Sequence, residues 1–270
     1  MIKATIILSF YKRIDYLKLV FAGLERQTFK DFEVVIADDG SPGDVIAEIE
    51  KLSVKVKFPV IHIWHEDKGF RKNKILNSAI KISNSDLLIF VDADCIPHSE
   101  FILEHYKNKK EKLCNTGRRV NLSNSITRIL SEENVKSGFL EKNKLRLIID
   151  GLFGHSFDVE KGFYFQNKIL RKYFNSKKRG ILGCNFSISK QDFLEINGFD
   201  ERYEAPSIGE DSDVQFRLEL NNVKINSLNN IAVQYHLNHK IQNRPQINLD
   251  LFEEVKKSKL SFTPFGIVRL

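Results

Sequence analysis

The sequence predicts an α/β protein with a mostly parallel central sheet flanked by helices. In the first hundred or so residues, short runs rich in Val and Ile alternate with segments whose apolar residues recur at helical spacing. The strand-like runs cover residues 5–10, 33–38, 60–64 and 87–92, and the helix-like segments cover residues 15–27 and 72–82. Strands and helices that alternate at this pitch form parallel βαβ units with right-handed crossovers.

The regular alternation stops after residue 106. Residues 107–180 are polar, basic and helix-prone, and Gly151, Gly154 and Gly162 interrupt them. A strand-like run resumes at residues 181–189, and we expect a helix over residues 211–221 and a last strand over residues 231–236. The sequence shows no repeat and no flexible linker, so one domain over residues 1–240 is expected, followed by a C-terminal extension over residues 241–270.

The composition of the chain excludes some classes of function but does not identify one. The net charge of +7 favours anionic partners such as nucleotide diphosphates, but a soluble protein from a lysine-rich proteome would look the same. No recognised nucleic-acid module is present, so we expect no nucleic-acid partner. No run of about twenty apolar residues occurs, and the N-terminal apolar run is too short for a signal peptide. The three separated cysteines favour reduced thiols and a cytoplasmic location.

Carboxylates gather where the predicted strands end, which is where open α/β sheets bind ligands. Asp92 and Asp94 directly follow the buried run at residues 87–91. Two carboxylates at this spacing can converge on one hard cation, which then bridges diphosphate oxygens. A solvated turn is the alternative interpretation. Phosphatases of the haloacid-dehalogenase type also place two aspartates after a strand, but near the N-terminus and before a small-residue turn, whereas Cys95-Ile96-Pro97 follows here.

Three further groups of residues are candidates for catalysis or for binding a metal or an anion. Glu210 and Asp211 precede a predicted helix, where they either cap it or supply an ionised base. His236 and His239 end the last predicted strand, and imidazoles three residues apart are either metal ligands or ordinary surface residues. The run from Gly69 to Lys74 places three cations at a helix start. The helix dipole disfavours cations there, so their position suggests a bound anion.

The order of the motifs along the chain resembles that of a known protein family. The N-terminal motifs are Ile6-Ile7-Leu8-Ser9-Phe10-Tyr11-Lys12-Arg13, Gln27-Thr28 and Ala37-Asp38-Asp39-Gly40-Ser41. The C-terminal motifs are Gly183-Cys184-Asn185-Phe186-Ser187-Ile188, Asn197-Gly198-Phe199-Asp200-Glu201, Gly209-Glu210-Asp211-Ser212-Asp213 and His236. Together they resemble the family 2 inverting glycosyltransferases with the GT-A fold. More narrowly, they are similar to the branch that shares its C-terminal half with β-1,4-galactosyltransferases and polypeptide N-acetylgalactosaminyltransferases.

The resemblance implies a UDP-sugar donor and a role for each donor-site residue. Asp39 would accept a hydrogen bond from uracil, and Phe10 and Arg13 would complete the pocket for the base and phosphates. Arg71 and Lys74 would face the nucleotide.

The resemblance also implies a Mn²⁺ or Mg²⁺ ion. Asp94 would bind the ion directly, and Asp92 would contact the ion or the ribose. His236 would be the third protein ligand, with His239 as the less favoured choice. Asp211 would be the base that activates the acceptor hydroxyl, and Glu210 would position the acceptor.

The resemblance divides the predicted domain into a nucleotide-binding half (1–106), a variable helical region (107–180) and an acceptor and catalytic half (181–240). It implies transfer of a hexose or N-acetylhexosamine to a glycan or glycolipid, in bacterial surface polysaccharide synthesis. A sugar-phosphate nucleotidyltransferase and a non-catalytic nucleotide- or sugar-binding module are the alternatives. The chain departs from the galactosyltransferase pattern at Ser207-Ile208, where a Trp-Gly pair is usual, and at Cys184, where glycine is common.

Aromatic residues and cations are mixed between residues 163 and 179. This segment is interpreted as a contact with an anionic membrane at the inner face of the cell membrane, as a lid over the acceptor site, or as a packed helix with a solvated basic face.

Overall fold

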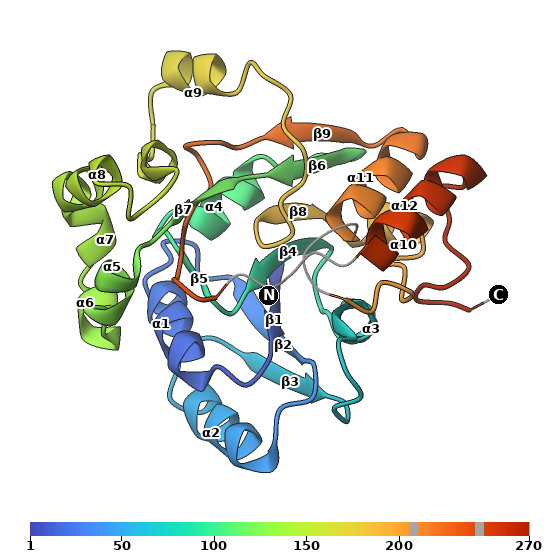
Figure 1. Cartoon of the computed structure of the whole chain (residues 1–270), viewed down its shortest axis with the longest axis horizontal. Coiled ribbons are helices and arrows are strands. Elements are labelled where there is room, and N and C mark those ends of the chain that lie inside the picture. Colours follow the sequence, from blue (N-terminus) through green and yellow to red (C-terminus); the bar gives the residue numbers. More distant parts are fainter. Residues whose placement is uncertain (206–209, 241–245, 270) are drawn as a thin grey trace.

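The computed structural model describes residues 1–205, 210–240 and 246–269. Within these residues the chain forms a seven-stranded sheet and a separate three-stranded sheet (Figure 1). The larger sheet has the order β3 (Val60–Trp64), β2 (Phe32–Asp38), β1 (Ala4–Phe10), β4 (Leu87–Asp92), β8 (Phe186–Ser189), β6 (Leu113–Thr116) and β9 (Lys224–Ser227). The smaller sheet has the order β5 (Cys95–Pro97), β10 (Val233–His236) and β7 (Arg118–Asn121).

The N-terminal half is built from the predicted parallel units. β1 pairs in parallel with β2 and β4, and β2 pairs in parallel with β3. The connections are α1 (Ile14–Glu25), α2 (Gly43–Ser53) and α3 (Lys72–Ile82). On β1, Ile6 and Leu8 belong to the core shared with α1 and α2, whereas Ile7 belongs to the core shared with α3. Because successive strand residues point to opposite faces, a sheet covered on both faces needs an unbroken apolar strand.

The C-terminal half extends the sheet with short strands. β8 is antiparallel to both β4 and β6, and β6 is parallel to β9. β6 and β7 were not predicted from the sequence, and they lie inside the region expected to be helical. Their polar side chains look like those of a loop, but they are bonded: Asn115 donates to the Asn108 carbonyl at 3.0 Å, and Thr116 Oγ1 donates to the Asn185 carbonyl at 3.2 Å.

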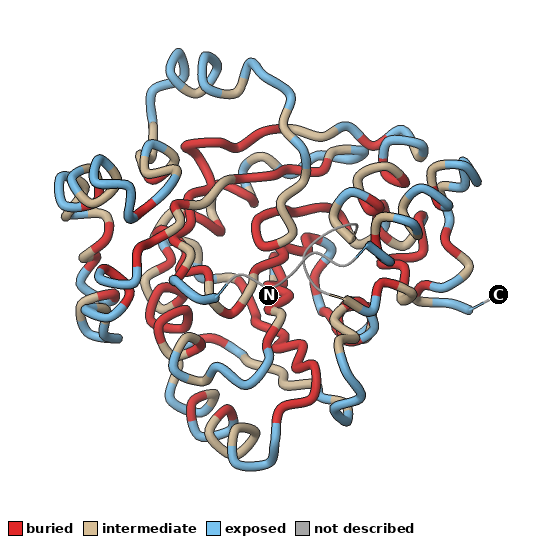
Figure 2. Tube along the Cα trace, in the orientation of Figure 1, coloured by how far each residue is buried: buried red, intermediate tan, exposed pale blue. Residues whose placement is uncertain are grey.

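The other regular elements in residues 107–180 are short helices. After α4 (Phe101–Lys107), the region contains α5 (Asn124–Arg128), α6 (Glu132–Lys136), α7 (Phe139–Lys142), α8 (Lys144–Leu152), the 3-10 helix η1 (Val159–Gly162) and α9 (Lys168–Phe174). Figure 2 shows that α9 is mostly exposed and α8 is partly exposed, whereas the central strands are buried. None of the helices in the described ranges is both long and apolar enough to cross a bilayer.

The described part of the C-terminal extension packs against the body. The remaining helices are α10 (Lys190–Glu195), α11 (Glu210–Leu220) and α12 (Gln246–Ser258). The side chain of Asn197, a residue with φ of 64°, donates to the carbonyls of Thr263 and Val268, each at 2.7 Å. Thr263 Oγ1 in turn donates to Asp200 at 2.8 Å. Two residues of the Asn-Gly-Phe-Asp motif therefore hold the end of the chain in place.

Candidate functional site

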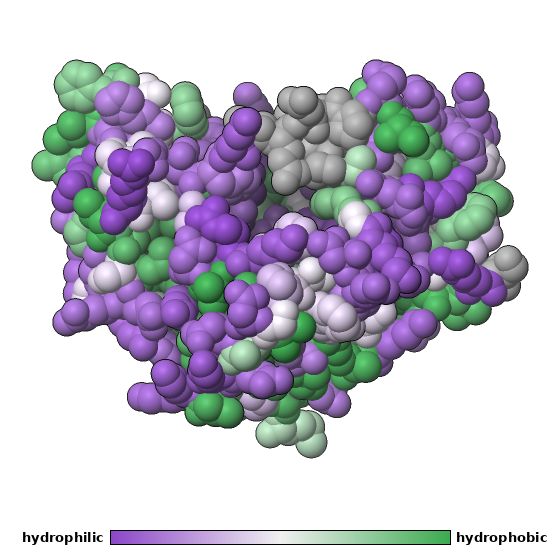
Figure 3. Space-filling model, turned by 60° about the horizontal axis from the view of Figure 1, so that its bottom comes forward, coloured by the Kyte–Doolittle hydropathy of each residue, from purple (hydrophilic) through white to green (hydrophobic). Residues whose placement is uncertain are grey.

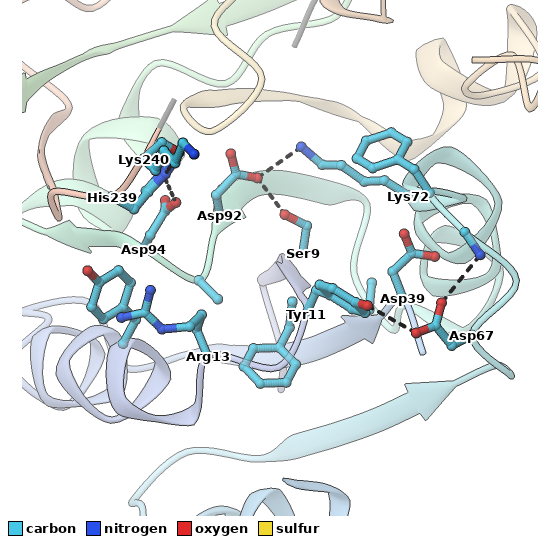
Figure 4. Close-up of a pocket in the computed structure, with 16 residues that line it drawn as sticks. Ser9, Tyr11, Arg13, Asp39, Asp67, Lys72, Asp92, Asp94, His239 and Lys240 are labelled. Carbon is cyan, nitrogen blue, oxygen red and sulfur yellow. Dashed lines mark hydrogen bonds and ion pairs between the residues drawn. The ribbon is translucent and has the colours of Figure 1, made fainter. Parts of the chain in front are cut away.

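The carboxyl ends of β1, β2 and β4 open into a cavity of about 600 Å³ (Figure 4). Six of the predicted site residues line this cavity: Phe10, Arg13, Asp39, Asp92, Asp94 and His239. Ser9, Tyr11, Tyr16, Asp67, Lys72 and Lys240 also line it. The parallel register explains the convergence, since Ser9 lies opposite Asp92 and Phe10 lies opposite Asp38 across neighbouring strands.

Asp39 forms one end of the cavity and is held in position on both sides. Its Oδ1 lies 2.7 Å from His65 Nε2, and its Oδ2 accepts the backbone N–H of Arg71 at 2.9 Å. A carboxylate has about four acceptor sites, so Asp39 can still accept a further N–H from a ligand. Gly40, with φ of +100°, makes the turn after Asp39, and an added Cβ there would lie 2.6 Å from the Asp67 Cα.

Arg13 and Phe10 form the neighbouring wall. Phe10 is buried. The guanidinium of Arg13 donates to both oxygens of Asp15, at 3.0 and 2.7 Å, and stacks over the Tyr16 ring at 3.7 Å. Arg13 therefore presents a pre-oriented positive charge at the cavity rim.

The two carboxylates that follow β4 face different partners. Asp92 Oδ1 accepts Ser9 Oγ at 2.5 Å and lies 3.1 Å from Lys72 Nζ. Lys72 Nζ is also 3.3 Å from Glu210 Oε1, so one ammonium bridges the two acidic clusters that the sequence analysis identified. Burial opposes the charge on Lys72, but the carboxylates of Asp92, Glu210 and Asp211 outweigh it and keep its pKa well above the ordinary lysine value.

Asp94 faces two imidazoles instead. Its Oδ2 lies 3.4 Å from His236 Nε2 and 3.1 Å from His239 Nε2, and the two nitrogens are 3.1 Å apart. β5 produces this arrangement, because it continues the chain from Asp94 and pairs antiparallel with β10, which sets His236 opposite Cys95. Burial alone would raise the pKa of Asp94, but hydrogen bonds from the two imidazoles lower it far below the usual value.

These three side chains could hold a divalent metal. Neighbouring ligands around an ion with bonds of about 2.1 Å lie roughly 3 Å apart, close to the separations found here. One carboxylate oxygen and two imidazole nitrogens form a mixed set that suits a borderline divalent ion. Cys95 Sγ also lies near Asp94 and His236, but this buried thiol donates to Asp94 Oδ1 at 3.2 Å and its pKa is raised mainly by burial. Cys95 therefore supports Asp94 as a neutral donor.

Asp211 lies beyond Lys72, in a smaller hollow that shares Ser9, Lys72 and Asp92 with the main cavity. Asp211 Oδ2 accepts the backbone N–H of Gly183 at 2.8 Å, and a Cβ on Gly183 would lie 2.3 Å from Asp211 Oδ1. Burial and the neighbouring Glu210 raise the pKa of Asp211 to about 7, although Lys72 works in the opposite direction. A carboxyl group with this pKa suits a general base near neutral pH.

Two predicted residues lie elsewhere. Lys74 is exposed and does not line the cavity. Arg71 reaches Asp39 only through its backbone, and its guanidinium donates to the Glu66 carbonyl. Lys72 belongs to the basic run at residues 69–74, but its local sequence did not predict a role for it. Ser207 and Ile208 lie outside the described residues. Cys184 is buried, and its sulfur accepts Arg119 Nη1 at 3.2 Å.

The chain matches known families and folds. A model of glycosyl transferase family 2 matches residues 5–176, and a model described as the N-terminal domain of galactosyltransferase matches residues 165–240. The uncharacterized glycosyltransferase YfnE of Bacillus subtilis (strain 168) is 26% identical over 74% of this chain and 56% of its own length. Chondroitin synthase of Escherichia coli is 22% identical over 86% of this chain and 34% of its own length. The chain thus spans about half or less of these relatives.

The structure of S. aureus TarS in complex with UDP-GlcNAc matches 96% of this chain and 65% of its own, with a TM-score of 0.60 and 16% identity. This match confirms the predicted GT-A fold, and the family model covers more than half of the chain. The chain belongs to glycosyl transferase family 2.

Proposed function

We propose that this protein is an inverting, metal-dependent glycosyltransferase that uses a UDP-sugar. It transfers a hexose or N-acetylhexosamine to a hydroxyl of a glycan or glycolipid, in bacterial surface polysaccharide synthesis. One observation carries the proposal: a single cavity runs from Asp39 to Asp94 and shares Lys72 and Asp92 with the hollow of Asp211. Nucleotide recognition, metal binding and proton removal are therefore available in that order.

The uridine is placed at the Asp39 end. The free acceptor capacity of Asp39 matches the single N–H of the uracil ring, and Phe10 supplies an apolar wall. Arg13 stands near the path of the phosphates. TarS, which shares this fold, has been solved with UDP and with UDP-GlcNAc, and this supports the choice of nucleotide.

The metal site is assigned to Asp94, His236 and His239, with Asp92 close by. Mn²⁺ fits this mixed oxygen and nitrogen set better than Mg²⁺, which prefers oxygen ligands alone. When bound, the ion would neutralise charge on the departing diphosphate. Lys72 holds Asp92 and Glu210 near one another and adds a second positive charge on the same side of the cavity.

Asp211 is the proposed base. It takes the proton of the acceptor hydroxyl as that oxygen bonds to the anomeric carbon. The bond between that carbon and the oxygen of UDP breaks on the opposite face, so an α-linked donor gives a β-linked product. Glu210, which Lys72 contacts at 3.3 Å, is placed to position the acceptor. We propose a cytoplasmic location, since the three cysteines are all free and buried thiols.

A panel of nucleotide sugars tests the proposed function. In the presence of Mn²⁺, purified protein should release UDP from at least one of UDP-glucose, UDP-galactose, UDP-N-acetylglucosamine and UDP-N-acetylgalactosamine, and more slowly after chelation. GDP-mannose and ADP-glucose serve as matched controls, because they carry purine bases in place of uracil. Turnover of those two donors alone would contradict the choice of UDP.

A further inference from the structure

Helix α9 packs against the protein through its polar residues. Arg171 donates to both oxygens of the buried Glu104, at 2.9 and 2.7 Å, and Tyr164 donates to the same carboxylate at 2.6 Å. One turn later, Asn175 donates to the Asn229 carbonyl at 3.0 Å and accepts the Asn229 N–H at 2.7 Å. These contacts, four residues apart on one helix face, fix how α9 is oriented.

Two apolar residues of α9 consequently face away from the protein. Ile169 is 79% exposed and Tyr173 is 73% exposed, and no residue of α9 is buried. A surface helix of a soluble protein normally turns its apolar stripe inward, so α9 has the reverse arrangement. Polar contacts hold the helix in place, and its apolar side chains remain available to a partner.

Helix α8 adds a second apolar stripe. Ile149, Leu152 and Phe153 are exposed and lie three and four residues apart, which places them on one face of the helix or at its end. In Figure 1, α8 lies at the left edge of the molecule and α9 lies at its top, both on the upper left side. Figure 3 shows apolar residues among hydrophilic ones on the side where α8 lies. We name Ile149, Leu152, Phe153, Ile169, Leu170 and Tyr173 the α8–α9 surface.

The charge around α9 identifies the chemistry of the partner. Residues 163–180 contain six lysines and arginines and no acidic residue. Lys168, Lys172 and Lys177 are exposed beside the apolar side chains of α9. A second copy of the chain that used the same surface would bring like charges together, since an isologous interface pairs a patch with itself. An anionic bilayer accepts both features, because its headgroups attract lysines while the boundary region takes up apolar side chains.

We propose that the α8–α9 surface docks the protein on an anionic lipid bilayer, with the apolar side chains of α8 and α9 inserted below the headgroups. The exposed lysines then lie at headgroup level. This inference does not depend on sugar transfer, since it concerns a surface on helices outside the cavity.

Vesicle co-sedimentation of the full chain tests the proposal. The protein should bind vesicles made of equal parts of phosphatidylcholine and phosphatidylglycerol, and bind phosphatidylcholine vesicles at least about tenfold more weakly. Ile169→Ser with Tyr173→Ser should weaken partitioning to the anionic vesicles about tenfold, because two exposed apolar side chains are lost. Lys172→Glu with Lys177→Glu should weaken it by more than about thirtyfold, because each lysine is not only lost but replaced by an anionic side chain.

Matched controls separate this surface from general basicity. Lys55→Glu with Lys57→Glu changes the net charge equally, and Val54→Ser with Leu260→Ser removes exposed apolar side chains elsewhere. Both controls should bind like the wild type, and circular dichroism and thermal unfolding confirm that all variants fold. Equal losses in the control and α9 variants would overturn the proposal. So would a concentration-dependent dimer, seen by sedimentation velocity, that disappears in the Ile169 and Tyr173 variant.

Discussion

Asp211→Asn should lose sugar transfer by a factor of about 10²–10⁴ and still bind UDP, because a general base contributes roughly that much to the rate. The amide has nearly the shape of the carboxyl group, and its oxygen can still accept the Gly183 N–H. Steady-state UDP release with acceptor present measures the first effect, and calorimetric titration with UDP measures the second.

The pH profile adds a readout that a structural defect would not give. Only the ionised form of Asp211 accepts a proton, and its pKa is raised to about 7 by burial and by Glu210. Wild-type transfer should therefore increase about tenfold per pH unit below 7 and level off above it. The residual activity of Asp211→Asn should lack this dependence. Asp44→Asn, an exposed site on α2, is the matched control. Transfer by Asp211→Asn within a few-fold of the wild type would rule out its role as base.

Asp94→Ala should abolish the stimulation of UDP binding by Mn²⁺, with a loss of affinity of about a hundredfold or more in the presence of the metal. The variant removes the carboxylate that lies 3.1–3.4 Å from both imidazoles and leaves two histidines without their anionic partner. Calorimetric titration of UDP with and without Mn²⁺ measures the effect directly.

Asp67→Ala is the control for this experiment. Asp67 also lines the cavity, but it contacts Tyr11 and Lys12 at the rim and has no place in the proposed metal site. Its removal should leave the Mn²⁺ dependence intact. An Asp94→Ala protein whose UDP affinity still increases with Mn²⁺ as in the wild type would contradict the metal assignment.

The sequence was most informative where local pattern and burial agree. The first four strands and the helices α1 and α3 were predicted because both sheet faces are covered, and this requires apolar runs separated by amphipathic segments. β6 and β7 were missed because strands of four residues with bonded polar side chains have no such pattern. The antiparallel insertion of β8 between β4 and β6 depends on tertiary pairing that no local signal records.

Only part of the candidate site could likewise be predicted from local sequence. Asp39, Asp92 and Asp94 could be predicted to meet because they follow strands that end at one edge of a parallel sheet. The proximity of His236 to Asp94 depends on the pairing of β5 with β10, and a three-residue strand such as β5 is too short to recognise. Lys74 was predicted to face the nucleotide, but Lys72 lines the cavity instead. Residues two apart on a helix point to nearly opposite sides, so the two lysines cannot both face it. Only the start of α3 at Lys72 decides which of them faces the cavity.

The anomeric configuration of the first product tests whether Asp211 acts as the base of a single displacement. Proton NMR, recorded while the enzyme transfers from an α-linked UDP-sugar that it accepts, distinguishes the two possible linkages by their coupling constants. A single displacement with Asp211 as base predicts a β-linked product from the start of the reaction. An α-linked product would contradict this mechanism, because it requires retention and a different role for Asp211.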